Sequence, residues 1–173
     1  VALSGFIKTF VGFKILQVGT GGLLSTFKPI IAAAALDAGT YSTETVWHDP
    51  GNIWASGHAI RNWDDGAYGD VKLVDIIKYS INTGFAHIGL LTGGKTLTEY
   101  ALKFGFGKPT GIELPGEGAG ILFNPDDMRD IDVATMSIGQ SIAVTPLQML
   151  QAYSALANGG QMVKPHILRT VNN

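Results

Sequence analysis

Ser25 and Lys28 are the first residues in the chain whose types and spacing suggest chemistry. They lie three positions apart, and Pro29 with the alanine-rich run behind it predicts a helix, so their side chains share one helix face. A serine hydroxyl is a poor nucleophile until a base takes its proton. A lysine is such a base only when neutral, which requires lowering its pKa from about 10.4 by roughly 3 units. Burial in an apolar pocket acts in that direction, so the pair predicts acyl transfer with Ser25 as nucleophile.

Ser80 and Asn82 form a second candidate element, Ser80-Ile81-Asn82, at the end of another expected helix. Serine–lysine acyl enzymes use a Ser-x-Asn element, in which the hydroxyl relays a proton and the amide holds the substrate. The plain structural interpretation is an asparagine at a helix end with a neighbouring serine. Chance gives roughly 0.4 Ser-x-x-Lys and roughly 0.3 Ser-x-Asn matches in such a chain, so neither motif alone identifies a function.

The elements that must position these residues are mostly helices. A helix is expected from near Ser25 to Ala38, ending at Gly39, and the last one has Thr145 as N-cap and Pro146 at its first position. Residues 40–70 are expected to be a long ordered loop in which three tryptophans anchor on the core. The remaining expectations are strands within 10–18, helices at 71–80, 85–91 and 97–104, a core face of Leu73, Ile76 and Ile77, and a loop or short hairpin at 105–125.

Composition excludes several classes of protein. The 173 residues carry a net charge of −2 and contain no cysteine, so we expect no nucleic-acid partner, disulfide, thiolate metal site or cysteine nucleophile. The apolar N-terminal segment is interrupted by Lys8, Lys14 and four glycines. No uninterrupted apolar run there approaches the roughly 20 residues of a membrane helix, and no signal peptide or anchor is expected within this sequence.

Two rival sites are weaker. Residues 89–96 fit the phosphate-loop pattern G-x-x-x-x-G-K-[ST], but the segment before them is a poor strand that continues a helical register. Candidate metal ligands lack the spacing of known metal sites, so no metal or other cofactor is expected. These candidates are His48, His58, His87, His166, Asn62, Asp64, Asp65 and Asp70.

Four longer stretches carry a family resemblance. They are residues 25–39, 62–85, 100–117 and 137–160, and in this order they resemble the transpeptidase domain of class B penicillin-binding proteins. The resemblance implies an α/β (α+β) fold of the β-lactamase/transpeptidase type, dominated by helices.

The resemblance also implies roles for the four residues. Ser25 would attack the penultimate D-alanyl peptide bond of a peptidoglycan stem peptide, with Lys28 as base. Ser80 would relay a proton, and Asn82 would donate a hydrogen bond to the substrate amide. β-Lactams would acylate Ser25. Other cell-wall synthesis proteins are implied partners, and the implied location is the extracytoplasmic face of the bacterial membrane.

The chain departs from the family pattern in two places. Gly21-Gly22-Leu23-Leu24 stands where the family has Pro-Gly before the nucleophile, so 1–24 is expected to be a separate segment and 25–173 a partial transpeptidase domain. The family's third motif, Lys-Thr-Gly on a sheet strand, is not found, and Pro109 interrupts the similar Lys108–Gly111. We therefore expect a fragment, truncation or rearranged homologue. An inactive binding module and a serine β-lactamase or esterase-type hydrolase stay open.

Overall fold

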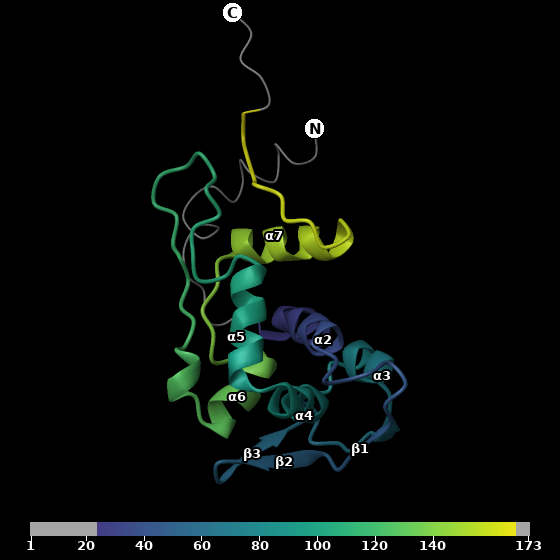
Figure 1. Ribbon diagram of the computed structural model, residues 1–173. Coiled ribbons are helices and arrows are strands. Elements are labelled where there is room, and N and C mark those ends of the chain that lie inside the picture. Colours follow the sequence, from purple (N-terminus) through teal and green to yellow (C-terminus); the bar gives the residue numbers. More distant parts are fainter. Residues whose placement is uncertain (1–23, 169–173) are drawn as a thin grey trace, which may run out of the picture.

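The computed structural model describes residues 24–168, in which helices are packed over two small pairs of strands (Figure 1). The strands expected within 10–18 lie outside the described residues. The helices are η1 (Leu24–Phe27, a 3₁₀ turn), α2 (Lys28–Asp37), α3 (Leu73–Lys78), α4 (Asn82–Thr92), α5 (Gly94–Lys103), η2 (Pro125–Asp127, also 3₁₀), α6 (Asp130–Ser137) and α7 (Pro146–Ala157). The strands are β1 (Trp47–Asp49), β2 (Asn52–Ala55), β3 (His58–Arg61) and β4 (Gly69–Val71).

Helix α2 lies among α3, α4 and α5 and carries Lys28 at its first position (Figure 1). Pro29 occupies the first turn, where the missing N–H removes no helical hydrogen bond. Ile30 and Ile31 are buried, and Gly39 leaves the helical region with a φ of 69°. The helix predicted over 25–38 is confirmed, with its first turn wound as η1.

Helices α4 and α6 approach closely at a glycine. A Cβ placed on Gly89 would lie 1.7 Å from Ser137 Oγ, so a side chain there would force the two helices apart. Helix α4 confirms and extends the helix predicted over 85–91. The sequence did not indicate α6, a two-turn helix that depends on tertiary packing more than on its own propensity.

Residues 40–70 are not the continuous loop that the sequence predicts. Strand β1 pairs antiparallel with β4, and β2 pairs antiparallel with β3. The β2–β3 turn has positive φ at both Ser56 (46°) and Gly57 (80°), as a type I′ hairpin turn requires. Strands of three or four residues show too little alternation to be recognised, although the Ser56-Gly57 dipeptide is a local turn signal.

Three large apolar side chains lie further out than predicted. Trp54 and Trp63 are 69% and 75% exposed, and Ile77 is 43% exposed. Trp54 lies on β2, and Trp63 lies in the loop after β3. Trp47 is the tryptophan that packs as expected, because its ring stacks on His87 with 4.8 Å between centroids.

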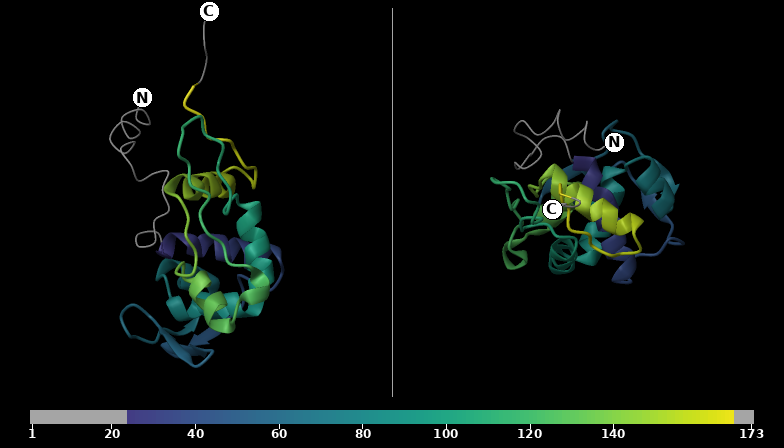
Figure 2. Two further views of the ribbon diagram at one scale, coloured as in Figure 1. Left: turned by 90° about the vertical axis from the view of Figure 1, so that its left-hand side faces the viewer. Right: turned by 90° about the horizontal axis from the view of Figure 1, so that it is seen from above.

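Helix α7 lies at the opposite end from the strands, as Figure 1 and the left view of Figure 2 show. Thr145 caps it: its hydroxyl accepts from Gln148 N at 3.1 Å, and Gln148 Oε1 accepts from Thr145 N at 2.8 Å. Pro146 holds the first position and Gly159 follows the end, as predicted. Residues 105–124 form the expected loop, with one isolated bridge from Ile121 to Ala143.

Helices dominate the described chain, and its strands form only two antiparallel pairs. This arrangement fits a partial α/β domain of the predicted type. None of the helices within residues 24–168 combines the length and apolar character that crossing a bilayer demands.

Candidate active site

Lys28 is the centre of the candidate site. It is only 2% exposed, and its ammonium donates three hydrogen bonds, to Ser80 O at 2.8 Å, Ser80 Oγ at 2.8 Å and Asn82 Oδ1 at 2.7 Å. The ring of Phe85 lies on another side, 5.5 Å from Nζ to the centroid. The lysine is therefore fixed by side chains that follow it by more than 50 positions in the sequence.

Burial lowers the pKa of Lys28 from its usual 10.5 to about 8. The low-dielectric surroundings disfavour the charged form, while the three oxygen acceptors favour it. With a pKa near 8, about one molecule in ten carries a neutral Lys28 at pH 7. Lys28 can therefore exchange protons near neutral pH, as a general base must.

Ser80 has an unusual backbone conformation that aims two oxygens at Lys28. Its φ is 54°, in the left-handed region where glycine is the usual residue. It lies just past α3, where Ser80 N donates to Ile77 O at 3.2 Å and Ile81 N donates to Ile76 O at 3.0 Å. This pair of bonds is a Schellman ending, and a serine occupies the position that normally favours glycine.

Asn82 is the first residue of α4, and its amide has a defined orientation. Oδ1 faces the ammonium of Lys28, and Nδ2 donates to Arg61 O at 3.1 Å. An ammonium only donates and a carbonyl only accepts, so these partners assign the oxygen and nitrogen of the amide. Within residues 24–168, Arg61 O is the one hydrogen-bond acceptor of Nδ2, which carries two protons.

Ser25 lies in η1, one turn before α2, and is exposed. Ser80 Oγ lies 3.3 Å from Ser25 Oγ, whereas no hydrogen bond joins Ser25 directly to Lys28 in the described chain. The connection therefore runs Ser25 Oγ, Ser80 Oγ, Lys28 Nζ. The structure brings all four predicted residues into one hydrogen-bonded group.

The rival sites are not assembled. The residues of the phosphate-loop pattern lie on α4 and α5 with Gly93 between them, so no strand leads into the pattern. Asn62 bonds to Asp49, Asp65 pairs with Arg61 and Asp70 pairs with His48. Among residues 24–168, no three histidine or acidic side chains are grouped closely enough to hold a metal ion.

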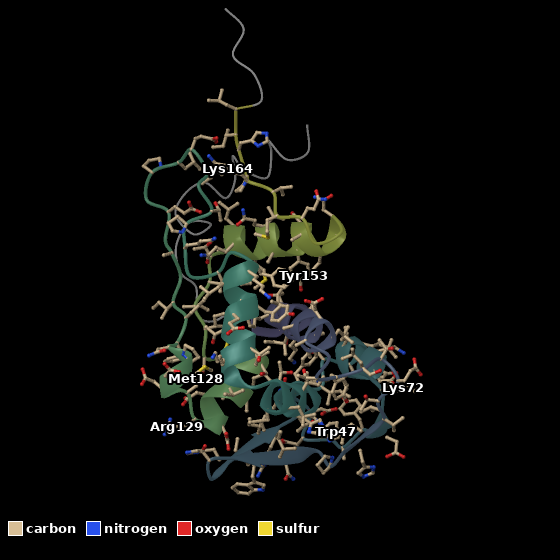
Figure 3. The ribbon with its side chains drawn as sticks, viewed as in Figure 1. Trp47, Lys72, Met128, Arg129, Tyr153 and Lys164 are labelled. Atoms are coloured by element: carbon tan, nitrogen blue, oxygen red, sulfur yellow. The ribbon has the colours of Figure 1, made fainter. Side chains whose placement is uncertain are left out.

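Three groups that contact the candidate site residues or their neighbours were not predicted from the sequence. They are the Phe85 ring, the Arg61 carbonyl and Tyr153 on α7. Tyr153 projects from α7 toward α2 (Figure 3), and its hydroxyl donates to Thr26 O at 2.8 Å, next to Ser25. A backbone carbonyl has no sequence signature. The aromatic residues could have been found only from their packing in three dimensions.

The sequence model of the family "Penicillin binding protein transpeptidase domain" matches residues 24–173. The chain belongs to this family. Stage V sporulation protein D of Bacillus subtilis is 38% identical over 146 residues, covering 84% of this chain and 23% of that protein. Peptidoglycan D,D-transpeptidase MrdA of Acinetobacter baumannii is 33% identical over 159 residues, covering 86% of this chain and 24% of that protein.

Solved structures share the fold. A peptidoglycan glycosyltransferase from Burkholderia ambifaria superposes with a TM-score of 0.85 at 27% identity, covering 96% of this chain and 52% of that chain. Penicillin-binding protein 3 of Mycobacterium tuberculosis, in complex with aztreonam, superposes with a TM-score of 0.79 at 28% identity. The match covers 90% of this chain and 34% of that chain. The chain spans about a quarter of the length of the two curated relatives. The expected transpeptidase-like fold is confirmed.

Proposed function

We propose that this chain is the nucleophile-bearing part of a peptidoglycan D,D-transpeptidase that binds penicillin, with residues 25–173 as a partial transpeptidase domain. Ser25 is the nucleophile, Lys28 the base, Ser80 the relay and Asn82 the donor to the substrate amide. The observation that carries the proposal is the continuous path from the exposed Ser25 hydroxyl through Ser80 Oγ to the buried Lys28 Nζ.

Acylation starts from the neutral form of Lys28. Ser25 Oγ attacks the carbonyl of the penultimate D-alanine as its proton passes to Ser80 Oγ and the Ser80 proton passes to Lys28 Nζ. The C–N bond then breaks, and the same path returns a proton to the departing D-alanine amine. An amine of a second stem peptide attacks the ester and regenerates Ser25.

β-Lactams would enter the same path by opening their ring on Ser25, and the relative bound to aztreonam supports this part of the proposal. Peptidoglycan stem peptides are the proposed substrates, and other cell-wall synthesis proteins are proposed partners. The proposed location is the extracytoplasmic face of the bacterial membrane.

A hydrolase would also need a group that activates water. Among the described residues, no carboxylate forms a hydrogen bond with Ser25, Lys28 or Ser80. The named D,D-transpeptidase among the relatives also supports transfer to an amine.

Incubation with a fluorescent penicillin, followed by intact mass measurement, tests the proposal. The wild-type chain should gain the mass of one penicillin, and Ser25→Ala should gain none. Ser42→Ala is the matched control, because Ser42 is an exposed loop serine outside the hydrogen-bonded group, and it should label as the wild type does. A folded wild-type chain that stays unlabelled at millimolar penicillin would favour an inactive binding module instead.

A further inference from the structure

The carboxylate of Asp49, at the end of β1, is fully buried, and no cation pairs with it in the described part of the chain. Burying a charge in this way is costly unless hydrogen bonds replace its water. Four donors do so. Oδ1 accepts from Gly51 N at 2.9 Å and Thr83 Oγ1 at 2.7 Å, and Oδ2 accepts from Asn62 Nδ2 at 2.8 Å and Tyr68 N at 3.0 Å. These fill the roughly four acceptor positions of a carboxylate.

Thr83 connects this carboxylate to the first turn of α4. Its hydroxyl has one proton and two acceptors in reach, Asp49 Oδ1 at 2.7 Å and Asn62 Oδ1 at 2.9 Å. The charged and nearer oxygen takes the proton, because charge-assisted hydrogen bonds are the stronger ones. Asn62 Oδ1 then accepts from Thr83 N at 3.2 Å. All three side chains are buried, and the Asp49 carboxylate is hydrogen-bonded to the first turn of α4, the end at which a helix dipole favours an acidic group.

The group formed by Asp49, Asn62 and Thr83 is connected to the Asn82 amide through two backbone segments. Thr83 directly follows Asn82 in α4, and Asn62 directly follows Arg61, whose carbonyl accepts from Asn82 Nδ2. The carboxylate therefore holds the backbone that carries Asn82 and the backbone that orients its amide. No shift of either segment leaves all four bonds to Asp49 intact.

We propose that Asp49 is a positioning residue, which fixes the Asn82 amide between Lys28 and the substrate by holding Thr83 and Asn62. The assignment of Asn82 to substrate binding rests on the proposed function, but the effect of Asp49 on the Asn82 amide does not. Asp49 touches none of the reacting atoms. It acts through the two backbone segments that its hydrogen bonds tie together.

Asp49→Asn tests this directly, since an amide cannot accept from all four donors. Two readouts are taken on the 173-residue chain at temperatures where circular dichroism shows it folded. The first is water exchange of the Asn82 side-chain NH₂ by ¹⁵N NMR, assigned by its loss in Asn82→Asp. We expect exchange at least roughly tenfold faster as the bond to Arg61 O loosens. The second is the rate of acylation by penicillin, expected to fall at least about tenfold because the amide is misplaced.

Asp70→Asn is the matched control, because Asp70 is an exposed carboxylate on β4, the partner strand of β1. It should change neither readout. Thr83→Val removes the hydroxyl that reaches Asp49 while nearly keeping the shape, and it carries the test if Asp49→Asn does not fold. Thr83→Ser restores the hydroxyl and should return both readouts toward wild type.

The outcomes separate the two proposals. Wild-type exchange of the Asn82 amide in folded Asp49→Asn, or in folded Thr83→Val, overturns the positioning role and leaves Asp49 with a purely structural one. A wild-type chain that is never acylated contradicts the proposed function alone, because exchange at Asn82 still reports whether Asp49 positions the amide.

Discussion

At the scale of the residue, Lys28 is held in surroundings that both oppose and support its charge. Burial disfavours the ammonium, while Ser80 O, Ser80 Oγ and Asn82 Oδ1 each accept one of its protons. The three acceptors match the three donors of an ammonium, so the protonated form is the resting form below the pKa. Loss of one proton frees a lone pair that can accept from Ser80 Oγ, which opens the path to Ser25.

The rate of acylation should therefore rise with pH. The pKa of Lys28 is lowered to about 8, so the neutral base is scarce at pH 6 and predominates above pH 8. We expect the rate of penicillin acylation to increase about tenfold per pH unit below the midpoint and to level off above it. Stopped-flow fluorescence with a labelled penicillin from pH 5.5 to pH 9.5 measures this. Lys28→Arg should be inactive throughout, because arginine stays protonated. A rate independent of pH would rule out Lys28 as the base.

The identities of the site residues were accessible from the sequence, but their arrangement was not. Spacing paired Ser25 with Lys28 and Ser80 with Asn82, and the four stretches that resemble the family gave these residues their predicted roles. The sequence could not show that the fold returns Ser80, 52 positions further along the chain, to within hydrogen-bonding distance of Lys28. Asp49 escaped because an aspartate before proline and glycine is typical of an exposed turn, and only the fold buries it.

At the scale of the element, the sequence predicts best those helices whose ends carry capping residues or prolines. Helices α2 and α7 were predicted well, since Pro29, Pro146 and the Thr145 cap act locally and leave a pattern in sequence. Helix α6 and strands β1 to β4 are short, and contacts with distant segments stabilise them. Local patterns therefore could not find them.

Helix α3 ends in a Schellman motif in which Ser80 occupies the position that usually favours glycine. Glycine suits the left-handed position of a Schellman ending, but glycine has no hydroxyl to offer Lys28. The left-handed backbone conformation is less favourable for serine than for glycine. The candidate site nevertheless has serine here, and the serine hydroxyl accepts a hydrogen bond from Lys28. Such strain at a site residue is expected where the surrounding structure holds the residue in place.

Replacing Ser80 should separate these two effects. Ser80→Ala and Ser80→Gly both remove the hydroxyl, so both should slow acylation at least about a hundredfold. Only glycine relieves the left-handed strain. We therefore expect Ser80→Gly to be more stable than Ser80→Ala by about 1 kcal/mol in urea unfolding, since that conformation costs other residues roughly this much. Equal stability of the two variants would show that φ at Ser80 is not strained, and unchanged acylation would remove Ser80 from the path.

At the scale of the whole molecule, α7 ties the far loop to the nucleophile end of the fold. Gln148 on its inner face donates to Lys108 O and Ala119 O, both at 2.8 Å, while its oxygen accepts from Thr145 N. Tyr153, five residues closer to the end of the same helix, donates to Thr26 O. One helix thus connects the loop within 105–124 to the turn that carries Ser25.

Gln148 should therefore contribute more to stability than a glutamine on the outer side of the same helix. Gln148→Leu keeps the burial but leaves two carbonyls and one N–H without partners, and each such group costs about 1–3 kcal/mol. We expect the free energy of unfolding to fall by about 3 kcal/mol in urea. Gln151→Leu, which removes one exposed bond to Val163 O, should change it by less than about 1 kcal/mol. Similar losses in the two variants would show that the loop is held by apolar packing and not by Gln148.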